Sequence, residues 1–408
     1  MKTEIIRKTE ELETAAKIIQ RGGLAAVPTE TVYGLAGNGL DAQAVHQIYE
    51  VKGRPEVKPL ALMVPGKEEM DRYCDPVPPA ARALADRFWP GPLSIVLKAR
   101  ENVPEIVRAG GPTVSLRCPD HPMTLALLRL ADLPLAAPSA NPSGQPSPKT
   151  AQEVLNYFDG RIDAVIDGGP CGLGRESTII DMSTAPYRIL RQGALPEEKI
   201  AHALAEELQL VGITGPTGCG KTTALQVLSE RGALILDCDR VYHELLERNQ
   251  GLLDELNEAF PGTVEDGKLR REKLSVIVFQ EPKALERLNA ISHRHVLEEV
   301  QRRLEAFAMA GGKLAAIDAI ELLSSGLGER CAFTLAVLAD PELRIRRIMA
   351  RDGIDRQAAE LRVKAQKPDA YYRKNCSYTL ENNGDMDLFI QNLNHILEEQ
   401  LKNERHEK

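Results

Sequence analysis

A phosphate-binding loop in the middle of the chain constrains the fold more than any other feature of the sequence. Residues 215–222 read GPTGCGKT and match G-x-x-x-x-G-K-[ST], a loop whose backbone N–H groups bind nucleotide phosphates at a helix N-terminus. Such a loop follows the first strand of its own sheet, and the apolar residues 210–214 (LVGIT) predict that strand. A second domain therefore begins near residue 208, and the residues before it must fold separately.

Both halves alternate strand-like and helix-like segments, which predicts an α/β fold throughout. We expect a twisted α/β sheet domain, with a sheet that could be mixed, over residues 1–207. Over residues 208–408 we expect a P-loop domain in which helices flank a parallel sheet. The predicted helices span residues 10–21, 42–51, 80–87, 123–130, 197–208, 222–231, 344–351 and 358–364, the last two facing solvent. The predicted strands span residues 24–27, 60–64, 93–98, 113–116, 135–137, 210–214, 233–236, 314–317 and 334–338.

Composition narrows the function classes. No apolar run approaches the roughly 18–20 residues needed to span a bilayer, and the charged start is unlike a signal peptide. The seven cysteines form no C-x-x-C pair, so we expect neither a disulfide framework nor a zinc site. Residues 1–205 carry 23 Lys and Arg against 25 Asp and Glu, and the whole chain has a net charge of −8. These features predict a cytoplasmic protein that is not a dedicated nucleic-acid binder.

The C-terminal half offers residues for phosphoryl transfer. In a phosphate loop, Lys221 would reach the β- and γ-phosphates of ATP and Thr222 would bind Mg²⁺. Asp237 and Asp239 follow the next predicted strand, where a carboxylate can take the proton of an attacking hydroxyl or hold the metal. Asp239 could instead cap the helix that follows it. Asp318 ends a third strand and could help to hold Mg²⁺ through water.

Arginines at helical spacing follow the last predicted strand. Such a run is usually a solvated face, but phosphoryl-transfer enzymes need mobile arginines over the γ-phosphate. The run consists of Arg344, Arg346, Arg347 and Arg351.

These motifs, together with DGKLRREKLSVIVF, NAISHRHV, ADPELRIRRIMARDG and ENNGD, resemble dephospho-coenzyme A kinase from about residue 210 to the end. The resemblance implies ATP-dependent phosphorylation of the ribose 3′-hydroxyl of dephospho-CoA. It implies Asp239 as the base and Arg347 and Arg351 as lid arginines. The implied ATP-binding residues are Gly215, Gly218, Gly220, Lys221, Thr222 and Thr223, and the implied acceptor-binding residues are Asp237, Asp239 and His293. The chain departs from the family pattern over residues 318–324 and at Arg294, on the side where the acceptor is expected.

The N-terminal half gathers polar residues in clusters. Residues 28–35 (PTETVYGL) follow a buried strand, residues 52–58 hold Lys52, Arg54 and Lys58, and residues 138–144 (PSANPSG) form a polar loop. Cations for charge and hydroxyls and amides for orientation can together bind a polyanion. Taken singly, the clusters also fit a capped turn, a solvated surface and an ordinary loop.

The same clusters, with FWPGPLSIVL, VSLRCPDHP, IDGGPCGLGRESTIID and ILRQGA, resemble the YrdC-like threonylcarbamoyl-AMP synthase family from about residue 4 to 195. The resemblance implies that L-threonine, bicarbonate and ATP give threonylcarbamoyl-adenylate and pyrophosphate, for the t⁶A modification of tRNA. It implies that Lys52, Arg54 and Lys58 hold the triphosphate and that Thr31, Arg117 and Ser139 hold threonine. The implied remainder of the nucleotide site is Thr113, Asn141, Ser147, Ser177 and Arg191.

The expected protein is therefore a bifunctional enzyme that uses ATP with Mg²⁺, with tRNA or tRNA-modification proteins as further partners. Two alternatives remain open at this point. The C-terminal half could be a nucleotide-binding regulatory module without kinase turnover, or the N-terminal half could be a double-stranded RNA-binding module.

Overall fold

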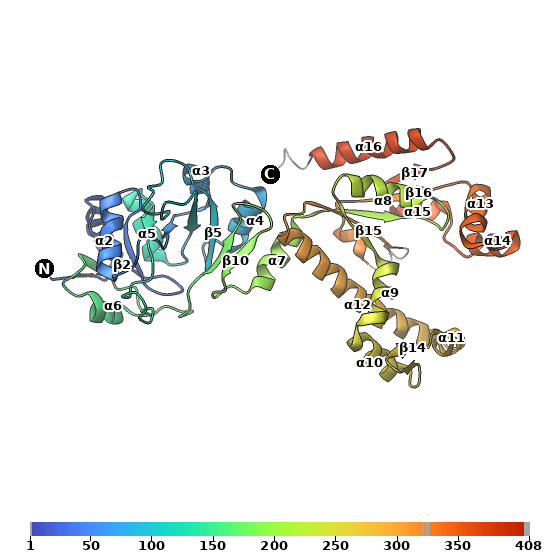
Figure 1. The fold of residues 1–408 in the computed structure, drawn as a ribbon, viewed down its shortest axis with the longest axis horizontal. Helices are drawn as coiled ribbons and strands as arrows, with labels where there is room; N and C mark the ends of the chain where they lie inside the picture. Colours follow the sequence, from blue (N-terminus) through green and yellow to red (C-terminus); the bar gives the residue numbers. More distant parts are fainter. Residues whose placement is uncertain (1, 320–321, 324–325, 404–408) are drawn as a thin grey trace. The chain divides into compact units, whose positions relative to one another are not determined.

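The computed structural model describes residues 2–319, 322–323 and 326–403, and it separates into two compact units (Figure 1). The first unit comprises the residues up to Glu207 together with 309–311, and the second comprises 208–308 and the residues from Gly312 onward. Within the described residues, no helix is long and apolar enough to cross a membrane.

In the first unit, the described strands form a ten-stranded mixed sheet in the order β1-β8-β2-β3-β7-β4-β6-β5-β9-β10. The mixed sheet that the sequence allowed is therefore present. The predicted strands occur within two residues of their expected bounds, and the additional strands are short and lie mainly at the sheet edges. The strands are β1 Glu4–Ile6, β2 Ala25–Val27, β3 Gly34–Asn38, β4 Ala61–Met63, β5 Leu93–Lys98, β6 Thr113–Arg117, β7 Leu135–Ala136, β8 Ala164–Ile166, β9 Thr178–Asp181 and β10 Arg188–Arg191.

Helices cover both faces of this sheet. Helices α1 (Leu12–Gln20) and α5 (Pro122–Ala131) pack together on one face, where their apolar stripes meet alternate residues of β1 to β4, β7 and β8 in one core. Helix α2 (Ala42–Lys52) packs on the other face, against Gly37 of β3. The remaining helices of the unit are α3 Met70–Tyr73, α4 Pro79–Phe88, α6 Ala151–Phe158 and α7 Glu197–Glu206.

Because side chains alternate between the two faces along each strand, one row of side chains lies over the middle of the sheet. Met63 lies opposite Arg117, Ala61 opposite Ser115, and Ser94 opposite Ile179 in the strand registers. Because side chains at i and i+2 point to the same face, these residues share the face that carries α1 and α5. That face bears the candidate site.

In the second unit, the described strands form a five-stranded, wholly parallel sheet in the order β12-β15-β11-β16-β17. The first strand, β11 (Gln209–Thr214), lies between β15 (Leu314–Asp318) and β16 (Phe333–Leu338), with β12 (Leu234–Asp237) and β17 (Tyr378–Glu381) at the edges. Ligands of such sheets bind at the carboxyl ends of strands where the order reverses. The phosphate loop follows β11 at this reversal.

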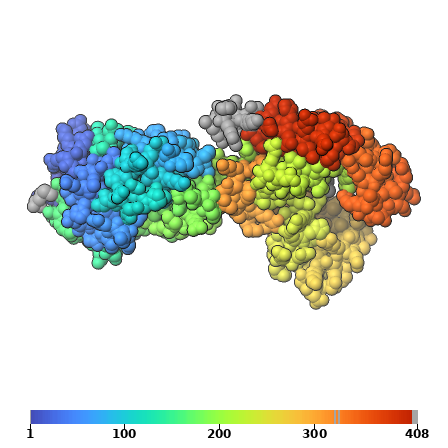
Figure 2. All heavy atoms as spheres, turned by 45° about the horizontal axis from the view of Figure 1, so that its top comes forward, coloured from blue at the N-terminus to red at the C-terminus, as the bar shows by residue number. Residues whose placement is uncertain are grey.

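Helices flank the parallel sheet, as the sequence predicted. Helix α8 (Lys221–Glu230) and helix α16 (Met386–Asn403) pack into its core together. Helices α9 (Cys238–Arg248), α10 (Gln250–Ala259), α11 (Arg271–Gln280) and α12 (Pro282–Met309) form a helical subregion with the short hairpin β13–β14 (Val264–Glu265, Lys268–Leu269). Figure 2 shows its yellow and gold part projecting from the sheet-bearing part of the unit. The last helices are α13 Pro341–Asp352, α14 Arg356–Lys364 and α15 Asp369–Asn375.

Candidate functional sites

A cavity of about 170 Å³ lies on the α1 and α5 face of the first unit. Its floor consists of residues from β4, β5, β6 and β9, and its rim comes from the loops after β2 and β7. Arg54, Arg117 and Arg191 all line it, from separate segments of the chain. Several guanidinium groups around one small cavity create a site for an anion.

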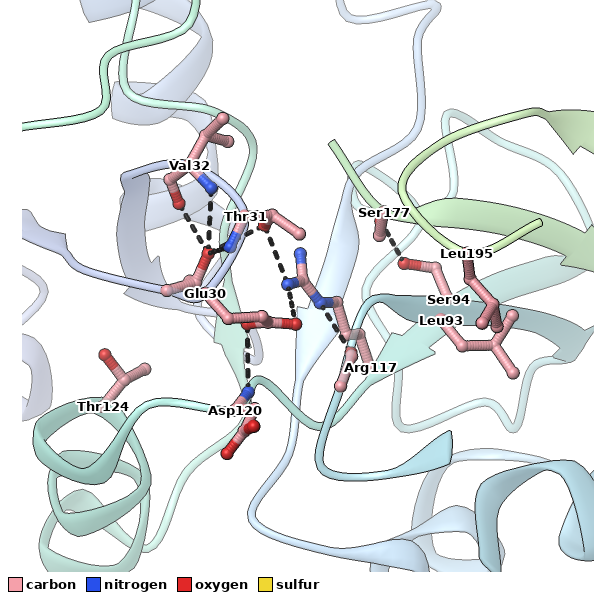
Figure 3. A network of polar contacts seen from close by, with 12 residues as sticks. Glu30, Thr31, Val32, Leu93, Ser94, Arg117, Asp120, Thr124, Ser177 and Leu195 are labelled. Atoms are coloured by element: carbon pink, nitrogen blue, oxygen red, sulfur yellow. Dashed lines mark hydrogen bonds and ion pairs between the residues drawn. The ribbon is translucent and has the colours of Figure 1, made fainter. Parts of the chain in front are cut away.

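Arg117 is held at the end of β6 by a buried network (Figure 3). Its Nη2 donates to Oε1 of Glu30 over 2.7 Å and to Oγ1 of Thr31 over 2.9 Å, and its Nε donates to the Gly91 carbonyl. The side chains of Arg117 and Glu30 are only 8% and 13% exposed. The second oxygen of Glu30 accepts from the Asp120 N–H over 3.0 Å. The described residues offer no partner to Nη1 of Arg117, so this donor is available to a ligand.

Thr31 is placed by the turn that precedes β3. Oγ1 of Thr29 donates to the Val32 carbonyl over 2.6 Å and accepts from the N–H groups of Thr31 and Val32. The hydroxyls of Thr29 and Thr31 also lie 2.8 Å apart, and either can donate to the other. The Thr31 hydroxyl is thus held between Thr29 and Arg117.

Arg191 crosses from β10 to the start of β9. Its Nε and Nη2 donate to the Ser177 carbonyl over 3.0 and 2.8 Å, and Nη2 also approaches Ser177 Oγ. Ser177 Oγ in turn contacts Ser94 Oγ over 2.8 Å (Figure 3). Gly193 permits this approach, because a Cβ there would lie 2.3 Å from the Ser177 carbonyl carbon. Burial lowers the pKa of Arg191, and the charges of Arg117 and Arg54 lower it further.

Lys52 is buried beside the cavity, not exposed as its cluster suggested. It is only 3% exposed, and its Nζ donates to the Ser139 and Asn141 carbonyls. Burial, and then the charge of Arg54, lower the pKa of Lys52 to about 7. The amine has three donors, so one remains for a ligand.

Of the predicted N-terminal residues, Arg54, Arg117, Ser139, Ser177 and Arg191 line the cavity, and Thr31 and Lys52 contact residues that line it. Four others do not line it. Lys58 is exposed, Thr113 lies four residues before Arg117 on the same face of β6, and Asn141 braces its own loop through Gln145. Ser147 donates to Glu176, which lines the cavity, so Ser147 contacts the lining as Thr31 and Lys52 do.

Sequence reasoning missed Glu30, Ser94 and Glu176 as site residues. Glu30 lies inside the PTETVYGL cluster that the sequence singled out. Its pairing with Arg117, 87 residues away, could not be predicted from that cluster. Ser94 and Glu176 sit on strands and loops whose pairing the sequence does not specify. No local signal could have found them.

In the second unit, the phosphate loop joins β11 to α8 as predicted. Gly220 precedes α8 with a φ of +94°, and Lys221 Nζ donates to the Gly215 carbonyl over 3.2 Å. Thr223 lies in the first turn, where its N–H donates to the Gly220 carbonyl. Gly218 also has a positive φ and no space for a Cβ beside Arg344.

Two side-chain clamps hold the loop. Gln366 accepts from the Thr217 N–H over 2.8 Å and donates to Thr217 Oγ1 over 2.6 Å, while Arg344 donates to the Thr217 carbonyl. Arg344 also donates to Gln366 over 2.8 Å. On the other side, Arg347 donates to the carbonyls of residues 218 and 219 and to Asn382.

These contacts change the prediction made for the arginine run. The predicted solvent-facing helix is wrong for Arg344, which is only 4% exposed because it packs under the loop. Arg347 reaches the loop, whereas Arg351, predicted as a lid residue, is exposed and paired with Asp352. The lid role of Arg351 stays a prediction.

Acidic side chains converge at the carboxyl ends of β12 and β15. Asp237 and Asp318 are register partners, and Asp318 lies 3.9 Å from Lys221 Nζ. Burial raises the pKa of Asp318 to about 6, with Lys221 opposing and Asp237 and Asp239 adding to the shift. Partial burial, then the Asp237 charge, also raises the pKa of Asp239.

The alternative role of Asp239 as a helix cap is wrong. Asp237 caps α9 by accepting from the Arg240 N–H over 3.0 Å, which places Asp239 in the first turn. Asp239 consequently faces a second cavity, of about 230 Å³, together with His293 of α12. Of the predicted acceptor residues, Asp239 and His293 therefore line one cavity, while Asp237 caps α9. Residues 320–321 and 324 of the divergent segment lie outside the described residues.

Comparison with protein-family models finds a match in each unit. Residues 17–193 match the Sua5–YciO–YrdC family, described as telomere recombination, and residues 209–387 match the dephospho-CoA kinase family.

The curated relatives match the N-terminal half. A threonylcarbamoyl-AMP synthase of Marinobacter nauticus is 35% identical over 175 residues, which cover 43% of this chain and 92% of that protein. Those of Pyrococcus abyssi and Bacillus subtilis are 45% and 42% identical over 48% and 49% of this chain. The match covers only 58% and 61% of their lengths.

Solved structures match over different shares of the chain. The P. abyssi Sua5 structure complexed with L-threonine aligns with a TM-score of 0.49 and 26% identity, over 83% of this chain and all of that one. A dephospho-CoA kinase from Campylobacter jejuni aligns with a TM-score of 0.36 and 20% identity, over 47% of this chain and 96% of that one.

Proposed function

The chain belongs to the threonylcarbamoyl-AMP synthase family, and we propose that its first unit makes threonylcarbamoyl-AMP from L-threonine, bicarbonate and ATP. The observation that carries this proposal is the cavity lined by Arg54, Arg117 and Arg191. Besides burial, the charges of Arg117 and Arg54 lower the pKa of Arg191, and a multiply charged anion between the three guanidinium groups would relieve this repulsion. ATP is such an anion.

Each residue then has a part in binding or orientation. Arg54, Arg191 and the free donor of Lys52 would hold the triphosphate. Nη1 of Arg117 would bind the threonine carboxylate, near the Thr31 hydroxyl that Arg117 itself holds. Thr113, Asn141, Ser147 and Lys58 stay predictions, since they do not line the cavity as it stands.

The chemistry needs no protein nucleophile. The threonine amine and bicarbonate form a carbamate with loss of water, and an oxygen of that carbamate attacks the α-phosphorus of ATP. The bond from that phosphorus to the bridging oxygen breaks, and pyrophosphate leaves with the electron pair. The site contributes charge neutralisation, alignment of two anions and exclusion of water. The product would supply t⁶A modification of tRNA.

For the second unit, we propose phosphorylation of dephospho-CoA by ATP. The phosphate loop and Lys221 would bind the β- and γ-phosphates, and Arg347 lies where it can reach the γ-phosphate. The ribose 3′-oxygen attacks the γ-phosphorus and ADP leaves. Asp239, exposed on its cavity and with a raised pKa, would accept the hydroxyl proton.

The residues around Lys221 fit Mg²⁺. Thr222 offers a hydroxyl at the start of α8, and Asp318 offers a carboxylate on the neighbouring strand. Both are hard oxygen donors, and nucleotide-bound Mg²⁺ uses only one or two protein ligands beside phosphates and water. Among the described residues no cluster of three or more His, Cys, Asp or Glu could hold a metal alone, which is consistent with a metal that arrives with ATP. Mg²⁺ would neutralise charge that develops on the phosphates.

The full-length protein tests both proposals in separate assays. Pyrophosphate release from ATP should require threonine and bicarbonate together, and Arg191→Ala should reduce it without changing phosphorylation of dephospho-CoA. Asp239→Asn should abolish that phosphorylation and leave pyrophosphate release intact. Threonine-independent pyrophosphate release would contradict the synthase.

The two alternative functions predict different outcomes. A wild-type protein that binds ATP but phosphorylates no acceptor would favour a nucleotide-binding regulatory module. Salt-sensitive tRNA binding without adenylate formation would favour an RNA-binding module in the first unit.

A further inference from the structure

The cavity beside Asp239 is lined by more residues than the transfer of a proton to Asp239 requires. It lies between α9, α12 and the end of β15, and its walls are mostly apolar, with Leu288, Val296 and Leu297 on α12. Asn289, Ser292, His293 and Val296 stand at i, i+3, i+4 and i+7, so one face of α12 forms one wall. An apolar cavity with a few convergent polar groups is typical of a small-molecule site.

Ser292 is the polar group in this wall that has no explained role. The residue is 8% exposed, its Oγ is buried, and the described residues offer it no hydrogen-bond partner. A helical serine usually satisfies its hydroxyl on the carbonyl four residues earlier, and Ser292 does not. Buried hydroxyls without partners are rare, and one that lines a cavity is satisfied when a ligand enters.

The charges around the cavity decide which part of an acceptor nucleotide fits. None of the described residues that line it is Lys or Arg, so it does not suit the diphosphate of the acceptor. The base is attached to the same sugar as the hydroxyl at Asp239, so it falls within reach of the adjoining cavity. Apolar walls accept the faces of a flat ring, and polar groups read its edge.

We propose that this cavity binds the adenine base of the acceptor nucleotide and that the Ser292 hydroxyl hydrogen-bonds to the edge of that base. The inference rests on the proposed phosphorylation of a nucleotide 3′-hydroxyl and assigns the residue that selects the base. A site built around such a hydrogen bond discriminates against analogues that lack the matching group.

The test compares two acceptors on the full-length protein: dephospho-CoA and its analogue with benzimidazole in place of adenine, which keeps a flat ring but lacks the amino group and nitrogens of the six-membered edge. With Ser292→Ala, kcat/KM for dephospho-CoA should fall about tenfold, the loss expected for one buried hydrogen bond. The preference for adenine over benzimidazole should shrink. The KM for ATP should not change. Ser292→Thr keeps the hydroxyl and should retain the preference, and Ser275→Ala, which removes an exposed hydroxyl bonded to Arg271, is the matched control.

Unchanged kcat/KM and unchanged base preference in Ser292→Ala would overturn the proposal. Calorimetry with dephospho-CoA separates it from failure of the kinase reaction itself. If the wild type binds dephospho-CoA without phosphorylating it, and Ser292→Ala binds more weakly than Ser275→Ala, the base site stands while the kinase reaction fails. Equal binding by both variants, or no binding by the wild type, refutes the base site.

Discussion

If Lys52 binds ATP as we propose, the affinity of the first unit for ATP should depend on pH. Its pKa of about 7 means that about half of the amines are charged at pH 7, and roughly a tenth at pH 8. If the charged amine binds the triphosphate, ATP affinity should fall up to about tenfold per pH unit above pH 7.5. The phosphates of ATP are already ionised in that range, so the slope reports the protein.

The assay is calorimetric titration with ATP between pH 7.5 and 9, in a Lys221→Ala background that weakens the phosphate-loop site. Binding at pH 8 should take up close to one proton, measured by repeating the titration in buffers of different ionisation enthalpy. Lys52→Met removes the titrating group, so its affinity should be low and flat across this range. A flat profile in the wild type, or the same slope in Lys52→Met, would refute the reasoning.

Stability supplies an independent readout with a definite sign. Below pH 7 the amine is charged in both the folded and unfolded protein, and the folded state carries the full cost of burying it. As pH rises through 7 the folded state releases its proton, while the unfolded chain holds it until about pH 10.4. The free energy of unfolding should therefore rise with pH relative to Lys52→Met, by up to about 1.4 kcal/mol per unit.

Three further substitutions test the geometry. Glu30→Ala leaves the buried Arg117 charge without its partner, so the free energy of unfolding should fall by about 3–5 kcal/mol in chemical denaturation; a loss below about 1 kcal/mol, the range of a surface pair, would contradict the buried ion pair. Gly193→Ala places a Cβ against Ser177 and should weaken ATP binding in the first unit while phosphorylation of dephospho-CoA is unchanged. Gln366→Ala removes both hydrogen bonds of this clamp to Thr217 and the acceptor for Arg344, so it should raise the KM for ATP in phosphorylation at least about tenfold, the effect of losing a single hydrogen bond, with pyrophosphate release unaffected. An unchanged KM would show that the loop holds its shape without Gln366.

Local patterns predicted the fold class, nine of the strands and several helices, but not the bounds of the two longest helices, α12 and α16. The α/β class and the parallel C-terminal sheet are confirmed, because buried strands and amphipathic helices leave periodic apolar signals that do not depend on distant residues. Short strands such as β1 and β8 escaped prediction. They have three residues each and are defined by pairing between Glu4 and Ala164, far apart in sequence.

The site residues likewise divide into those that local patterns predicted and those that they did not. The phosphate loop could be read directly, since its geometry is set within eight residues. The burial of Arg344 and the pairing of Arg351 could not, because helical spacing gives the period of a face without saying what packs on it.

The sequence by itself determined two α/β units, the phosphate loop and the residue types that bind two sets of anions. Tertiary structure alone decided which of those residues meet. It paired Glu30 with Arg117, lowered the pKa of Lys52 by burying it near Arg54, and placed Asp239 on the same cavity as Ser292 while Asp237 caps the helix. Charge, burial and hydrogen bonding act between residues that are close in space. The sequence therefore specifies which side chains are available, while the packing of the fold determines their contacts and their pKa values.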